Sequence, residues 1–126
     1  MEYIFLLGRV LFGGYFVLSG IRHFRKTNYL AQYAASKGLP APKVGVVVSG
    51  LMMFLGGLGI VLGMYIMWSV AFIAAFLIVS AFTIHAFWKL SDPAAKASEE
   101  IQFSKNIALA GAALMFLSIP LGLWTL

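Results

Sequence analysis

The chain has 126 residues, of which 62% are hydrophobic and 10% are charged, and its formal net charge is +5. Soluble domains carry about 45–50% apolar and about 25% charged residues, so the composition excludes a soluble globular protein and indicates a one-domain integral membrane protein. The positive charge does not indicate nucleic-acid binding, because the basic residues flank apolar runs. The chain has no cysteine, which excludes thiol chemistry and thiolate-held metal centres.

Apolar runs predict an all-α fold, an integral membrane four-helix antiparallel bundle. About 20 apolar residues cross a hydrocarbon core of about 30 Å, so each run is long enough. The stretch from Val44 to Trp88 is too long for one crossing, and Gly63, Met64 and Tyr65 are expected to form a turn within it. The expected spans are residues 3–24, 44–62, 65–88 and 106–126, in a single domain covering residues 1–126.

Two polar connectors, Arg25–Lys43 and Lys89–Lys105, separate these runs. In the first, Thr27 or Asn28 is expected to cap an interfacial helix that extends through Ser36 and stops at Gly38. Pro40 and Pro42 would prevent its continuation. The second connector is expected to be polar throughout and to leave no carboxylate inside any span.

The distribution of basic residues predicts the topology. All but Arg9 of the nine basic residues lie in or beside the two connectors. The positive-inside rule then places both connectors in the cytoplasm and both termini outside, an N-out/C-out arrangement. With Glu2 near the start and no basic n-region, we expect no cleaved signal peptide.

An ordered set of motifs resembles the DoxX family of small four-helix membrane proteins. These motifs are Gly8-Arg9, Ser19-Gly20, Tyr33-Ala-Ala-x-x-Gly38-Leu-Pro40, Gly56-Gly57 with Gly63, His85-Ala-Phe87-Trp88 with Asp92, and Gln102-Phe103-x-Lys105-Asn106-x-Ala108-x-x-Gly111. The resemblance covers nearly the whole chain. It implies a multi-pass protein of the bacterial or archaeal cytoplasmic (inner) membrane, whose relatives include parts of thiosulfate:quinone oxidoreductases and companions of other quinone-linked or oxidative-stress systems.

The chain departs from that family pattern at Met53, where many members carry a glutamate. An ion pair between Arg9 and a glutamate of the second span is therefore not available here. A proton-handling role for that glutamate cannot be carried over to this chain.

Arg9 has two interpretations. An arginine inside a span is costly and is usually paired or functional, so it could clamp an anion or a carbonyl oxygen of a quinone or lipid. Alternatively, it could extend to the outer headgroups or to Glu2.

The other candidate ligand-binding residues are expected near the cytoplasmic interface. Quinone binding needs donors to two carbonyl oxygens and a group that exchanges protons, and histidine suits the second task. Interfacial anchoring explains the same residue types equally well. The candidates are Ser19, His23, His85, Gln102, Lys105 and Asn106.

Two functional hypotheses follow, and they leave open whether the chain is an enzyme. The first is a subunit or accessory of a quinone-linked redox system that binds a quinone or a lipid headgroup. The second is a non-enzymatic membrane scaffold, chaperone or anchor for a partner protein.

Haem ligation by His23 and His85 lacks a supporting motif, and no metal site is expected. The Gly59-x-x-x-Gly63 pattern suggests a homo-oligomer.

Overall fold

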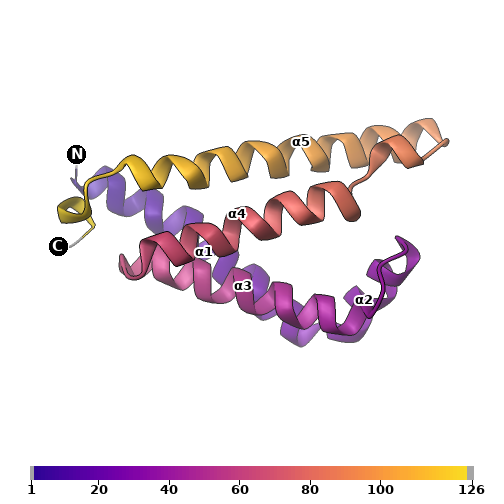
Figure 1. The fold of residues 1–126 in the computed structure, drawn as a ribbon, viewed down its shortest axis with the longest axis horizontal. Coiled ribbons are helices and arrows are strands. Elements are labelled where there is room, and N and C mark those ends of the chain that lie inside the picture. Colours follow the sequence, from indigo (N-terminus) through magenta and orange to yellow (C-terminus); the bar gives the residue numbers. More distant parts are fainter. Residues whose placement is uncertain (1, 125–126) are drawn as a thin grey trace.

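The computed structural model describes residues 2–124, which form helices and turns (Figure 1). Four of the helical segments are long and apolar enough to cross a membrane, which confirms the expected all-α membrane class. The α-helices are α1 (Glu2–Arg25), α2 (Thr27–Ser36), α3 (Pro42–Leu62), α4 (Ile66–Thr83) and α5 (Pro93–Met115). Short 3-10 turns cover Phe87–Lys89, Phe116–Ser118 and Leu121–Leu123.

The most extensive contact between two helices is that of α1 with α3, and glycine residues allow these helices to approach closely. A Cβ at Gly13 of α1 would lie 2.6 Å from the carbonyl oxygen of Gly57, and a Cβ at Gly57 would lie 2.5 Å from that of Gly13. Backbone thus meets backbone at this crossing, as small residues allow in membrane helices. Phe16 and Met53 are buried in the core beside the crossing.

The turn between α3 and α4 lies at Gly63, which has a left-handed φ of 72° and donates its backbone N–H to Gly59. Both glycines of the Gly59-x-x-x-Gly63 pattern pack within the chain. A Cβ at Gly59 would overlap the side chain of Ser69, and one at Gly63 would lie 2.5 Å from Nη2 of Arg9. The pattern is therefore used in packing within the chain.

α5 starts earlier than the expected fourth span. Asp92 caps it by accepting a hydrogen bond from the backbone N–H of Ala95 at 2.9 Å, and Pro93 occupies the first turn. Most of the expected polar connector Lys89–Lys105 is therefore helical. Glu99 and Glu100 lie in the polar first turns of α5, and the apolar part of that helix follows them.

α5 also ends earlier than expected. The helix stops at Met115, and Ile119 is extended (φ −84°, ψ 127°) because the residue before a proline disfavours helical geometry. Pro120 therefore lies beyond the helix, not inside it. The last two residues of the expected span, 125 and 126, lie outside the described range.

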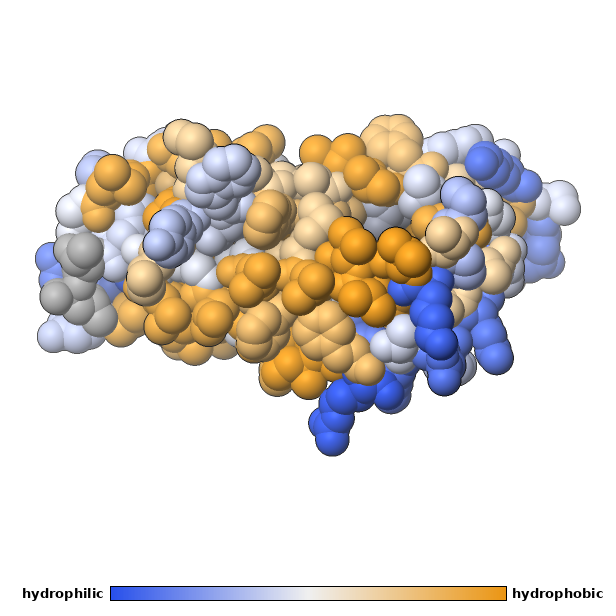
Figure 2. Space-filling view, turned by 60° about the horizontal axis from the view of Figure 1, so that its bottom comes forward, coloured by the Kyte–Doolittle hydropathy of each residue, from blue (hydrophilic) through white to orange (hydrophobic). Residues whose placement is uncertain are grey.

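The two ends of the bundle differ. At the end that holds the N-terminus and Trp124, called here the terminal end, the rings of Phe5 and Trp124 meet at 4.9 Å, and those of Phe12 and Phe116 at 5.0 Å. At the opposite end, the basic end, α4 and α5 diverge from α1, α2 and α3 (Figure 1). Hydrophilic side chains gather at that end, beyond a broad apolar surface (Figure 2).

α2 is the short helix expected in the first connector, but its start differs. The N-cap is Lys26, which makes no side-chain cap, and Thr27 bonds backward to the carbonyl oxygen of His23 at 2.8 Å. The expected capping by Thr27 or Asn28 is therefore wrong. Gly38, with φ of 84°, follows the end of the helix as expected.

Candidate functional site

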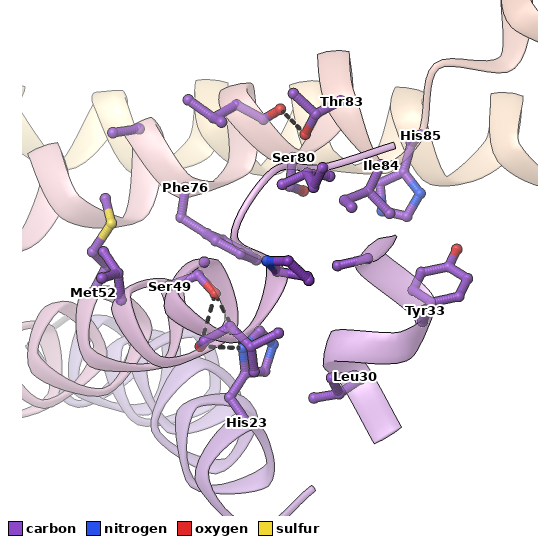
Figure 3. Close-up of a pocket in the computed structure, with 18 residues that line it drawn as sticks. His23, Leu30, Tyr33, Ser49, Met52, Phe76, Ser80, Thr83, Ile84 and His85 are labelled. Carbon is purple, nitrogen blue, oxygen red and sulfur yellow. Dashed lines mark hydrogen bonds between the residues drawn. The ribbon is translucent and has the colours of Figure 1, made fainter. Parts of the chain in front are cut away.

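A cavity of about 400 Å³ lies at the basic end, between α2, α3 and the end of α4 (Figure 3). This volume falls within the range of about 300–1,000 Å³ that is usual for small-ligand sites. The walls are largely apolar, with Met52 and Phe76 on the inner side. Val48 of α3 and Val79 of α4 also line it, and both are about half exposed on the outer surface of the spans (48% and 60%). The cavity therefore opens sideways through the apolar surface.

His23 stands on one wall, at the basic end of α1. Its Nδ1 lies 3.1 Å from the carbonyl oxygen of Val46 and 3.1 Å from Oγ of Ser49. A carbonyl oxygen can only accept, so Nδ1 carries the proton and the neutral ring has its lone pair on Nε2. Within residues 2–124, Nε2 has no hydrogen-bond partner, and it is available to a ligand.

His85 lies on another wall, just after α4, and is held by a carboxylate (Figure 3). Its Nδ1 donates to Oε2 of Glu99 at 2.6 Å, with both side chains mostly buried. This pairing fixes the ring orientation, as second-sphere carboxylates do for functional histidines. The other ring nitrogen, Nε2, has no partner among the described residues and can exchange a proton with a bound molecule.

The same carboxylate connects α5 to α2. Oε1 of Glu99 accepts from the Tyr33 hydroxyl at 3.1 Å and from Nζ of Lys37 at 3.4 Å. Burial and the nearby charge of Glu99 raise the pKa of Tyr33 to about 12, so its hydroxyl stays protonated and keeps donating at neutral pH. Since α4 and α5 otherwise diverge from α2, this network joins the two sides of the cavity.

A second cavity, of about 230 Å³, adjoins the first. The two share His23, His85 and Ser80, together with Phe76, whose ring contacts His23 at 6.2 Å. Six of the seven candidate residues line the smaller cavity. They are Ser19, His23, His85, Gln102, Lys105 and Asn106.

Arg9 does not join this group. It is buried (2% exposed) near the terminal end, where Nε donates to the carbonyl oxygen of Ile60 at 3.1 Å and Nη2 to that of Val61 at 3.0 Å. The guanidinium lies 5.2 Å from the Trp124 ring centre. Arg9 thus caps the carboxyl end of α3, where a cation is favourable. Within residues 2–124 it forms no ion pair with Glu2.

Three residues of the site were not among the candidates: Tyr33 and Ser80 line the larger cavity, and Glu99 holds His85 without lining it. Ser80 accepts a hydrogen bond from Nδ2 of Asn106 at 2.7 Å and lines both cavities. The Asp92-Pro93 pair signals a helix start and would have placed Glu99 one turn before Gln102 on α5. No local signal indicates that Tyr33 lies against Glu99, because that contact depends on how α2 and α5 pack.

The fold and the cavities define a multi-pass membrane protein of four long apolar helices, with a ligand-sized cavity at one end. The family model described as DoxX matches residues 4–86, well over half of the chain, and the chain belongs to the DoxX family. The match ends before α5, so it does not cover Glu99, Gln102, Lys105 or Asn106. Neither curated proteins nor solved structures give a significant match.

Proposed function

We propose that the protein binds a quinone in the larger cavity and serves as a membrane subunit or accessory of a quinone-linked redox system. One observation carries this proposal: an apolar cavity of about 400 Å³ has on its walls two histidines with free Nε2 atoms. A quinone ring needs apolar walls for its faces and polar groups for its two oxygens. Orientation with the basic end in the cytoplasm follows from the positive-inside rule.

Each polar residue has a distinct task in this proposal. A protonated His85 would donate from Nε2 to one quinone oxygen, while Glu99 balances its charge through Nδ1. The hydroxyl hydrogen of Ser80 is not used within the described residues and could donate to the same molecule. His23 would act on the other side of the ring as an acceptor when neutral and a donor when protonated.

The test is quinone retention by protein gently extracted from membranes, together with binding of an added short-chain quinone. Wild type should retain about one quinone per chain, and His85→Ala should lose it. Ala75→Phe should also abolish binding, because Ala75 is an exposed residue on the cavity wall and the added ring fills the space. The matched control is Ala71→Phe, one turn earlier on α4 and outside the cavity. Retention of bulk lipid alone in wild type would contradict the proposal.

The scaffold hypothesis remains the alternative. Gly13, Gly57, Gly59 and Gly63 meet atoms of this chain, whereas Gly8, Gly14 and Gly111 have open space beside them, so small-residue surfaces on α1 and α5 are still available to a partner. The cavity is preferred as the functional feature because it carries the two histidines. If wild type carries no quinone and the His23→Ala/His85→Ala double variant behaves as wild type in cells, the scaffold hypothesis would take its place.

A further inference from the structure

The smaller cavity gathers cationic and polar side chains and has no carboxylate among its lining residues. Two of the residues that line it are cationic, Arg22 and Lys105, and none is acidic. Ser19 and Gln102 add a hydroxyl and an amide from the facing helices α1 and α5. The cavity thus has a positive lining, in contrast to the apolar walls of its larger neighbour.

These donors have no partner within residues 2–124. No hydrogen bond or ion pair is formed there by the side chains of Ser19, Arg22, Gln102 or Lys105. Ser19 is the most buried of the four, being only 8% exposed. A serine or threonine hydroxyl in a membrane helix usually bonds its own backbone, as Thr83 does to Val79 at 2.7 Å. The Ser19 hydroxyl makes no such bond and is open to the cavity, where a ligand can reach it.

The acid closest along the helix does not fill this role. Glu99 precedes Gln102 by one turn on α5, yet its Oε1 is bonded to Tyr33 and Lys37, and its Oε2 to His85. The charges of Arg22 and Lys105 are therefore left without a carboxylate in the cavity.

We infer that the smaller cavity is a binding site for a phosphate group, either free or in a lipid headgroup. A phosphate offers several strong acceptor oxygens that point in different directions, which suits donors arriving from α1 and α5 on opposite sides. Arg22 and Lys105 are exposed at the rim and supply the charge, while Ser19 supplies an inner donor. The site adjoins the proposed quinone site, and five residues line both cavities: His23, Leu30, Phe76, Ser80 and His85.

The experiment is isothermal titration calorimetry on the full chain, delipidated in a phosphate-free maltoside detergent. Two probes are used: inorganic phosphate, and a short-chain phosphatidic acid. We expect one equivalent of at least one probe to bind. Arg22→Gln and Lys105→Gln should each weaken binding about tenfold or more, since a charge-assisted hydrogen bond contributes on the order of this factor, and Lys105→Arg should retain it. Binding of phosphate alone would identify a free anion, and binding of the lipid alone would identify a headgroup.

The matched control is Lys96→Gln, an exposed lysine on the same helix that lines neither cavity. It should bind the probe as wild type does. The inference is overturned if neither probe binds, or if Lys96→Gln weakens binding as much as Lys105→Gln. Ala75→Phe, which fills only the larger cavity, should leave phosphate binding intact, so failure of the quinone proposal and failure of this one give different results.

Discussion

His85 and Glu99 are joined by a hydrogen bond of 2.6 Å between Nδ1 and Oε2, and the same carboxylate also accepts from Tyr33 and Lys37 of α2. One side chain of α5 therefore holds both a histidine of the cavity wall and the helix on the far side of the cavity. The arrangement makes Glu99 the residue whose removal should affect the basic end most widely.

Glu99→Gln should loosen the basic end. The amide keeps the size of the side chain but removes the charge that His85 and Lys37 need, so the free energy of unfolding should fall by about 1–3 kcal/mol. Hydrogen exchange of the backbone of α2 should become faster, because its link to α5 is lost. Thermal unfolding in detergent and exchange mass spectrometry measure the two effects. Glu100→Gln is the control, since Glu100 is exposed and its side chain forms no hydrogen bond or ion pair within residues 2–124.

Burial and the charge of Glu99 raise the pKa of the Tyr33 hydroxyl to about 12, and Glu99→Gln should lower that pKa by the part that the charge supplies while the part due to burial remains. Because the pKa is raised in the folded state, this group stabilises the fold below pH of about 10 and loses that contribution as pH rises through about 12. Phenolate absorbance gives the titration, with Tyr33→Phe subtracted to remove the other tyrosines. An unshifted Tyr33 in wild type would mean that neither its burial nor its contact with Glu99 persists in solution.

Arg9→Met should destabilise the protein without altering ligand binding. The substitution removes the hydrogen bonds to the carbonyl oxygens of Ile60 and Val61. The free energy of unfolding should fall by about 2 kcal/mol, because the lost hydrogen bonds are partly offset when a charge no longer has to be buried. Thermal unfolding measures the loss, and quinone and phosphate binding at low temperature provide the second readout. Loss of binding with unchanged stability would instead give Arg9 the role of a ligand clamp.

Gly13→Ala and Gly14→Ala form a matched pair on adjacent positions of α1. A Cβ at Gly13 would lie 2.6 Å from the Gly57 carbonyl oxygen, whereas one at Gly14 has no heavy atom within 4 Å. Gly13→Ala should therefore push α1 from α3 and lower stability by about 1–3 kcal/mol, the usual cost of overpacking. Gly14→Ala should be neutral or slightly stabilising, because alanine favours helix over glycine. Equal melting temperatures would contradict the close crossing.

The membrane class and the Gly63 turn could be predicted because they depend on local sequence: apolar length sets a span, and glycine allows the left-handed turn. Six of the candidate residues line one cavity because they lie at the same level along the bundle axis. That level can be predicted from the position of each residue in its span and from the basic residues beside it. The expected connector Lys89–Lys105 was assigned from its polarity alone, and its helix was missed. Asp92 and Pro93 start that helix even though polar residues follow them. The partners of Glu99 and Arg9 could not be predicted, because those contacts arise only when separate helices pack.

The half-exposed valines at the rim of the larger cavity, Val48 and Val79, have a consequence for how any ligand arrives. A molecule dissolved among the acyl chains can move in laterally without ever being solvated by water. Occupancy then depends on the mole fraction of that molecule in the bilayer, and its aqueous concentration matters only through partitioning. Diluting the protein with added lipid, at a fixed total amount of ligand, will empty the cavity even though nothing in the surrounding buffer has changed.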